Sequence, residues 1–240
     1  MSKVILVASG KGGTGKTMFS VNLGCILSSL GKNVVIIDLD MGMRNLDMYL
    51  GLEGKVVYDT YDALKGVCRT RQALIKDDKF KNLSIIAASP INDLKSIPKE
   101  SATILFKELK QRFDYVIIDG PPGVGSNLEL VAGYADAGIV VLTPDYAAIR
   151  DADSVEAFLR KNRVKDRYYV INKAVLQLEK RGLEVRFDEI DSMIKAKPLG
   201  AIAYDENIHI STNMGVPIVS KKNAYITKNF LKIANRIIED

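Results

Sequence analysis

The chain opens with an apolar run that leads directly into a glycine-rich segment. Residues 4–8 read Val-Ile-Leu-Val-Ala, and residues 9–17 read Ser-Gly-Lys-Gly-Gly-Thr-Gly-Lys-Thr. Apolar residues then recur at helical spacing between residues 19 and 30. A strand, a glycine-rich turn and a helix N-terminus in that order form a phosphate cradle, because glycines let backbone N–H groups turn inward and the helix dipole adds positive potential there. The segment therefore predicts an α/β fold built around a phosphate-binding loop.

The spacing Gly10-x4-Gly15-Lys16-Thr17 is that of the P-loop of nucleotide-binding proteins. In that loop the lysine reaches the β- and γ-phosphates and the threonine places its hydroxyl on Mg²⁺. A glycine-rich turn with no ligand is the alternative. We expect the nucleotide-binding residues to be Gly10, Lys11, Gly12, Gly13, Thr14, Gly15, Lys16 and Thr17.

Two later strands end in carboxylates. Asp38 and Asp40 follow the β-branched run 33–38, and Asp119 ends the apolar run 113–119. Open α/β sheets bind ligands at the carboxyl ends of their strands, so these side chains can reach magnesium-bound and attacking waters. An apolar strand that ends in Asp after a P-loop is a Walker B arrangement, whose carboxylate holds a water of the Mg²⁺ shell. An isolated Asp-x-Asp would equally cap a turn. After Asp119, residues 120–123 predict a rigid turn near the γ-phosphate.

Composition bounds the class of protein. The 240 residues are 47% apolar and 26% charged, which is ordinary for a soluble globular protein, and no apolar stretch approaches the roughly 18 residues of a membrane span. The two cysteines lack metal or redox spacing, so a reduced cytosolic compartment is the simplest interpretation. The net charge of +5 is spread along the chain and permits an anionic partner without identifying one. With no repeat or linker, we expect one domain spanning 1–240.

Lys11 is a second lysine in the loop. A solvated surface lysine is one interpretation, but Lys-Gly-Gly-x-Gly-Lys-Thr resembles the deviant Walker A motif of the MinD/ParA ATPases. The resemblance covers nearly the whole chain, and its further motifs are the acidic stretch 38–47, the Arg-Asp-x-Asp at 150–153, the Asn-Lys at 172–173 and the Asn-x-Gly-x-Pro turn at 213–217. Pro-Pro-Gly at 121–123 departs from the Pro-Ala-Gly usual in the MinD branch.

The resemblance implies a doubly wound, mostly parallel β-sheet flanked by helices. It also implies hydrolysis of ATP with Mg²⁺, coupled to a monomer–dimer switch that acts in septum placement during cell division. Lys11, Lys16 and Asp40 would be catalytic, with Lys11 completing the nucleotide site of the partner subunit and Asp40 orienting the hydrolytic water. Thr17, Asp40 and Asp119 would be the metal-site residues. The amide of Asn172 would read the adenine edge.

The same resemblance implies an ATP-dependent homodimer in the bacterial cytoplasm and a MinC-like division inhibitor as partner. Arg150, Asp151 and Asp153 would form part of the surface that the inhibitor recognises. These acids also open an expected helix that starts near Ile149, so a favourable interaction with its dipole is an equal alternative.

Other members of the superfamily give competing interpretations. A ParA-type partition ATPase would bind DNA through a concentrated basic patch, and the spread charge argues mildly against nucleic-acid binding. A MinD-like regulator of flagellar number usually carries an N-terminal segment before the first strand. Iron–sulfur carriers need a Cys-x-x-Cys pair, which this sequence lacks. A non-hydrolysing scaffold would have lost Lys16, Asp40 or Asp119, and all three are present.

The last third of the chain is less sharply patterned. Residues 187–194 predict a short helix, 198–203 a strand and 177–182 a charged connection. Residues 224–240 predict a helix that covers the sheet with Ile226, Phe230, Ile233, Ala234 and Ile237. Because that apolar face is occupied, we expect membrane contact by this chain to be weak or absent, and association only through a partner or a further C-terminal segment.

Overall fold

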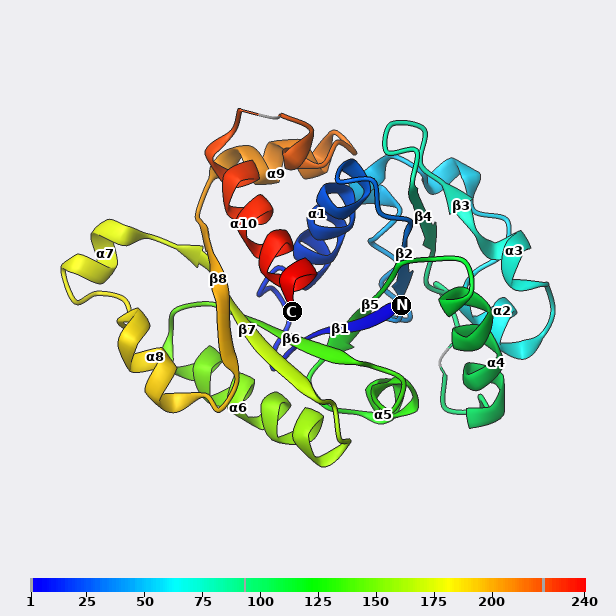
Figure 1. Ribbon diagram of the computed structural model, residues 1–240, viewed down its shortest axis with the longest axis horizontal. Helices are drawn as coiled ribbons and strands as arrows, with labels where there is room; N and C mark the ends of the chain where they lie inside the picture. Colours follow the sequence, from blue (N-terminus) through cyan, green and yellow to red (C-terminus); the bar gives the residue numbers. More distant parts are fainter. Residues whose placement is uncertain (1, 93, 222) are drawn as a thin grey trace.

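The computed structural model describes residues 2–92, 94–221 and 223–240. One eight-stranded sheet runs through the molecule in the order β3-β4-β2-β5-β1-β6-β7-β8 (Figure 1). All neighbouring pairs are parallel except β3 and β4, which are antiparallel. The strands are β1 (Lys3–Ser9), β2 (Val34–Asp38), β3 (Ile75–Lys76), β4 (Leu83–Ile86), β5 (Tyr115–Pro122), β6 (Ala137–Leu142), β7 (Asp166–Ala174) and β8 (Lys197–Ala203).

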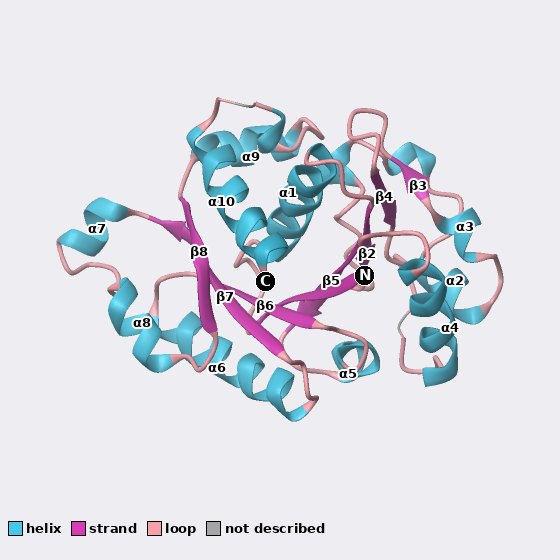
Figure 2. Cartoon of the chain, in the orientation of Figure 1, coloured by secondary structure: helices cyan, strands magenta, loops and turns pink. Residues whose placement is uncertain are grey.

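Helices cover both faces of this sheet (Figure 2). Helices α1 (Lys16–Ser29) and α10 (Tyr225–Glu239) pack on one face, together with α9 (Glu206–Asn213) near the sheet edge. The opposite face carries α2 (Thr60–Lys65), α3 (Thr70–Ala73), α4 (Lys99–Lys110), α5 (Ser126–Ala132), α6 (Tyr146–Lys161) and α8 (Phe187–Met193). The remaining helical segments are α7 (Leu176–Lys180) and the 3₁₀ turns η1 (Met48–Leu50), η2 (Glu53–Lys55) and η3 (Ile218–Ser220). In the described part of the chain, no helix is long and apolar enough to cross a membrane.

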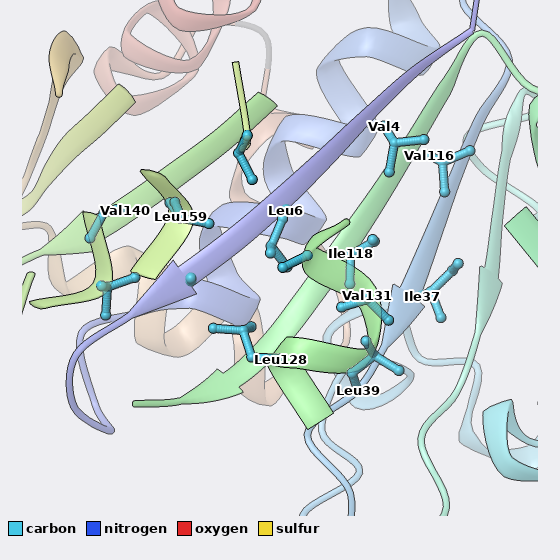
Figure 3. Close-up of a cluster of buried hydrophobic side chains, with 14 of the residues drawn as sticks. Val4, Leu6, Ile37, Leu39, Val116, Ile118, Leu128, Val131, Val140 and Leu159 are labelled. Atoms are coloured by element: carbon cyan, nitrogen blue, oxygen red, sulfur yellow. The ribbon is translucent and has the colours of Figure 1, made fainter. Parts of the chain in front are cut away.

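The central strand β1 shows why its sequence is apolar without interruption. Val4 and Leu6 point into the cluster beneath α5 and α6, while Ile5 and Val7 point into the cluster beneath α1 and α10. Figure 3 shows the first of these clusters, with Leu6 close to Ile118 and Leu128. Strands of a parallel sheet are buried on both faces, so their sequences are continuously apolar and do not alternate between apolar and polar residues. The predicted α/β architecture is confirmed.

The C-terminal helix lies as the sequence predicts. All five apolar residues that were expected to cover the sheet are buried in α10. Phe230 stacks obliquely on Phe19 of α1, with ring centroids 5.8 Å apart. The two helices thereby close one face of the sheet as a unit.

Three local predictions are wrong. Residues 120–122 continue strand β5 instead of forming a turn, and only Gly123 turns the chain, with φ 73°. Residues 176–180 form α7, where the sequence suggested only a charged connection. Helix α6 begins at Tyr146, capped by Asp145, and not near Ile149.

The earlier start of α6 changes the meaning of its acids. Asp151 and Asp153 lie beyond the first turn, so interaction with the N-terminal end of the helix dipole does not explain them, because that effect falls off within the first turn. The capping role belongs to Asp145, whose side chain accepts the N–H of Ala148.

Candidate nucleotide-binding site

A cavity of about 680 Å³ opens at the carboxyl edge of the sheet, where β1, β2, β5, β7 and β8 end. Strand β1 lies inside the sheet, with β5 and β2 on one side of it and β6 and β7 on the other. Open α/β sheets bind ligands at the carboxyl ends of their strands, where the strand order reverses in this way. Its lining combines most of the residues expected from the sequence with several that were not. They are Gly12, Gly13, Gly15, Lys16, Thr17, Met18, Asp40, Met43, Asn45, Tyr49, Pro122, Asn172, Lys173, Ala203, Tyr204, Asp205, Glu206, Ile208, His209 and Thr212.

The loop between β1 and α1 is shaped as a cradle. Gly13 and Gly15 have φ of 78° and 93°, a region that side chains other than glycine rarely adopt. A Cβ at Gly12 or Gly13 would meet nothing within 4 Å, so open space lies beside the loop. Gly15 offers no side-chain cap to α1, so the first N–H groups of that helix remain available to an anion. Lys16 is only 6% exposed and lies in this cavity wall.

Asp119 lies fully buried next to the loop. Its Oδ1 accepts a hydrogen bond from Ser20 Oγ at 2.8 Å, whereas its Oδ2 has no hydrogen-bond donor. Burial raises the pKa of Asp119 to about 6, against the opposing effects of the nearby Thr17 hydroxyl and Lys16 ammonium. A buried acceptor without a donor fits a hydrated cation, because such a cation supplies both charge and water protons.

Asp38 was expected to reach waters in the site, but its carboxylate binds backbone N–H groups instead. It lies opposite Asp119 in the pairing of β2 with β5, and burial and that neighbour raise its pKa well above the ordinary value. Its two carboxylate oxygens accept the backbone N–H groups of Asp40, at 2.9 Å, and Leu46, at 3.3 Å. Asp38 thus shapes the loop that carries Asp40, and does not line the cavity.

Asp40 itself lines the cavity and is half-buried. Burial raises its pKa, and the charge of Lys16 acts in the opposite direction. The described residues contain no group of three or more His, Cys, Asp or Glu side chains placed to hold a metal by themselves. Magnesium needs none, since it keeps several waters and takes one or two carboxylates together with phosphate oxygens.

Lys11 does not line the cavity. Its Nζ lies 3.1 Å from Oδ1 of Asp145, and both side chains are about half-exposed, at 41% and 48%. The other oxygen of Asp145 accepts a hydrogen bond from Thr143 Oγ1 at 2.6 Å. Although burial acts to raise the pKa of Asp145, the hydrogen bonds from Thr143, Ala148 and Lys11 lower it below the ordinary value.

Asn172, at the end of β7, is 1% exposed and already committed to the loop. Its Nδ2 donates to the carbonyl of Thr14 at 2.7 Å, while its Oδ1 has no donor. Only the Oδ1 acceptor therefore remains for a ligand, so the amide can accept a hydrogen bond from the adenine edge but has no free donor to offer it. The next residue, Lys173, donates from Nζ to the carbonyl of Gly13 at 2.9 Å.

The three residues expected at a partner surface lie on α6. Arg150 and Asp153 are exposed, but Asp151 is half-buried against the loop. A Cβ placed on Gly10 would overlap the Asp151 side chain and come within 2.5 Å of its carbonyl carbon. Asp151 is thus distant from the loop in sequence and adjacent to it in space.

The far end of the cavity is formed by the end of β8 and by α9, with Tyr204, Asp205, His209 and Thr212 among its lining residues. None of these four residues is among those that the sequence predicts for the site. The structure places all four of these positions in the cavity wall.

Comparisons with known proteins identify the family of this chain. Residues 1–238 match the ParA family model, described as an NUBPL iron-transfer P-loop NTPase. The septum site-determining protein MinD of Helicobacter pylori is 37% identical over 99% of this chain and 91% of that protein.

Two solved structures superpose on nearly the whole chain. A chain of the MinC:MinD cell division protein complex of Aquifex aeolicus has a TM-score of 0.93 at 32% identity, and the match covers 100% of this chain and 96% of that chain. MinD of Pyrococcus horikoshii, solved in complex with Mg-ADP, has a TM-score of 0.88 at 25% identity, covering 99% and 96%.

Proposed function

This chain belongs to the MinD/ParA family of P-loop NTPases, and from that premise we propose that it is a Mg-ATP-dependent ATPase and dimerisation switch that acts in placing the division septum. The observation that carries the proposal is the convergence of Lys16, Thr17 and Asp40 on one cavity, beside the donor-free carboxylate oxygen of Asp119. The relatives named for septum placement match this chain over nearly its full length.

The loop and α1 would bind the phosphates of ATP. The N–H groups of Gly12, Gly13, Thr14 and Gly15 and the Lys16 ammonium supply positive charge where the phosphates would lie. Gly10 serves the loop by permitting close packing on α6. On the base side, the free Oδ1 of Asn172 is an acceptor that suits the amino group of adenine.

Thr17, Asp40 and Asp119 would hold Mg²⁺. The ion neutralises charge on the β- and γ-phosphates when it is bound. Asp119 would act through a water of the magnesium shell, and Asp40 would also orient the hydrolytic water. Asp38 supports Asp40 by holding its backbone N–H.

Lys11 would complete the site of a second subunit. An exposed lysine-carboxylate pair contributes only about 0–1 kcal/mol, so a phosphate group presented by a second copy competes readily with Asp145 for the ammonium. Charge supplied in trans to a phosphoryl-transfer site is worth about 10³–10⁵ in rate where arginine fingers do it. Hydrolysis would then depend on dimerisation.

We further propose that α6 presents Arg150, Asp151 and Asp153 to a MinC-like partner. Arg150 and Asp153 are exposed on α6, and Asp151 of the same helix packs against Gly10 of the loop. The Aquifex relative was solved in complex with MinC. Replacing Asp151 and Asp153 by Ala should weaken binding of a purified MinC-like protein and preserve basal hydrolysis, because Ala keeps the Cβ that lies against Gly10. Loss of basal hydrolysis would instead assign these acids to the active site.

Sizing the protein with ATP and with ADP tests the central proposal. We expect a dimer with ATP, a monomer with ADP, and a persistent ATP-bound dimer for Asp40→Ala, which should bind but not turn over the nucleotide. If neither the wild type nor Asp40→Ala hydrolyses ATP, the result would favour a nucleotide-binding scaffold. ATP-dependent retention on DNA would favour a partition ATPase. Iron transfer is not proposed, because the only cysteines are Cys68 and the buried Cys25.

A further inference from the structure

Strand β7 is irregular where it meets the loop. In its pairing with β8, Ile171 lies opposite Ala201 and Ala174 lies opposite Ala203, so β7 takes three steps where β8 takes two. The extra residue falls at positions 172–173, and Lys173 has φ 57°, in the left-handed region. A β-bulge of this kind bends one strand locally and re-aims a side chain, and such bulges are common beside active sites.

The bulge explains an unusual pair of contacts. Successive side chains on a regular strand point to opposite faces of the sheet. Asn172 and Lys173 nevertheless both reach the loop, where their nitrogens hold the consecutive carbonyls of Thr14 and Gly13. Left-handed backbone at a lysine is unfavourable, so the local conformation is maintained by its surroundings.

Holding a carbonyl also sets the direction of an N–H group. The peptide unit is planar and trans, so its C=O and N–H point in opposite directions. The carbonyl of Gly13 shares its peptide unit with the N–H of Thr14, and the carbonyl of Thr14 shares its unit with the N–H of Gly15. Fixing both carbonyls toward β7 turns both N–H groups away from it.

We propose that Lys173 is a positioning residue which, together with Asn172, clamps the loop so that the N–H groups of Thr14 and Gly15 face the phosphates before any nucleotide arrives. The tight fit supports this assignment, since a Cβ on Gly15 would overlap Asn172 Nδ2. Lys173 acts through the loop and need not touch the nucleotide. The effect of the clamp on ATP binding rests on the proposed function, whereas the contacts that form the clamp do not.

Amide hydrogen exchange of residues 10–17, measured without nucleotide, tests the clamp directly. Lys173→Met removes the ammonium and keeps the length of the side chain, and exchange in this segment should accelerate about threefold or more if a charged hydrogen bond is lost. Lys173→Arg keeps a donor and should restore slow exchange. Lys180→Met is the matched control, because Lys180 is an exposed lysine of α7 that does not line the cavity.

Lys173→Gly separates the clamp from the stability of the fold. Glycine suits the left-handed backbone, so this variant should unfold at the same temperature as wild type or higher, yet exchange rapidly in the loop. ATP binding should weaken about three- to tenfold in the Met and Gly variants, with kcat at saturating ATP nearly unchanged.

The outcomes distinguish the clamp from its alternatives. Unchanged exchange in Lys173→Met overturns the clamp, even if affinity falls, because a lysine that contacts only the nucleotide leaves the free loop unaltered. Unchanged affinity despite faster exchange also overturns it. If wild type itself fails to bind ATP, the proposed function fails, whereas the exchange result without nucleotide still decides whether the clamp exists.

Discussion

The Lys11 ammonium lies 3.1 Å from Oδ1 of Asp145, the carboxylate oxygen that also accepts the N–H of Ala148 and caps helix α6. One carboxylate therefore joins the phosphate-binding loop to the first turn of α6 within a single copy of the chain. If Lys11 serves a second subunit, it must first leave Asp145, so the strength of this pair should influence how readily the dimer forms.

Replacing Asp145 by Asn should strengthen ATP-dependent dimerisation. Asparagine caps a helix as well as aspartate does, so α6 should keep its first turn while Lys11 is released from the charge. An exposed pair is worth about 0–1 kcal/mol, which corresponds to at most about a fivefold lower dimer dissociation constant. Analytical ultracentrifugation with ATP measures that constant.

Asp78→Asn is the control for this change, because it removes another surface lysine-aspartate pair, with Lys55, outside the cavity. It should leave the dimer dissociation constant unchanged. A weaker dimer in Asp145→Asn would mean that the carboxylate contributes to the assembled state instead of restraining the free one.

The two lysines of the loop should have separable roles. Lys16→Ala should abolish ATP binding, because the buried ammonium lies in the cavity wall. Lys11→Ala should bind ATP almost normally but neither dimerise nor hydrolyse it, because Lys11 lies outside the cavity on Asp145. Titration with a fluorescent ATP analogue, followed by sizing, measures both. Normal turnover by Lys11→Ala would identify Lys11 as an ordinary surface lysine.

Gly10→Ala should damage the fold more than Gly12→Ala does. At residue 10 the added methyl group would overlap Asp151 and its backbone, whereas at residue 12 it would meet nothing within 4 Å. Overpacking of this kind costs about 1–3 kcal/mol. Urea unfolding of the nucleotide-free proteins should show that loss for Gly10→Ala alone. Equal stabilities would mean that α6 moves aside at little cost.

The stability of the nucleotide-free, metal-free protein should depend on Asp119 in a pH-sensitive way. The pKa of Asp119 is raised to about 6, against about 3.9 in an unfolded chain, so the folded state binds the extra proton between these values. The corresponding stability is fully present below about pH 4 and is lost as pH rises through about 6.

Above about pH 6 the buried side chain of Asp119 carries a negative charge, and Asp119→Asn removes it. We expect it to raise the free energy of unfolding by about 1–3 kcal/mol at pH 7.5 and to change it little at pH 4.5, while Mg-ATP binding is lost. Urea unfolding with a chelator at both pH values measures the difference. A loss of stability at pH 7.5 would show that the carboxylate is already well compensated without a metal.

Much of this architecture is readable from the sequence because it depends on local patterns. The glycine spacing predicts the loop, the apolar runs that end in Asp38 and Asp119 predict strands, and the apolar stripe of residues 226–237 predicts the C-terminal helix. The cap at Asp145 also had a local signal, since an acid that precedes a helical pattern is a typical N-cap.

Other features depend on partners far away in the chain. The pairing of Lys11 with Asp145 joins residues 134 positions apart, and no local pattern encodes it. The bulge at Lys173 has no signal either, because lysine is not a residue that favours left-handed backbone.

The two prolines 121 and 122 suggested a turn. They lie at the irregular end of β5, where β2 has ended opposite Asp119 and the register with β1 shifts before Ser9 lies opposite Pro122. Proline, which lacks an N–H donor, is tolerated at such a place.

The close approach of Gly10 to α6 has a genetic consequence. A side chain at position 10 and a shift of α6 would disturb the same contact, so substitutions at these two places should combine non-additively. Revertants of a defective position-10 allele are therefore most informative when sought within residues 146–155, where a smaller residue or a displaced turn would make room. The positions of such suppressor mutations would identify, from genetic data alone, the residues of α6 that contact the loop.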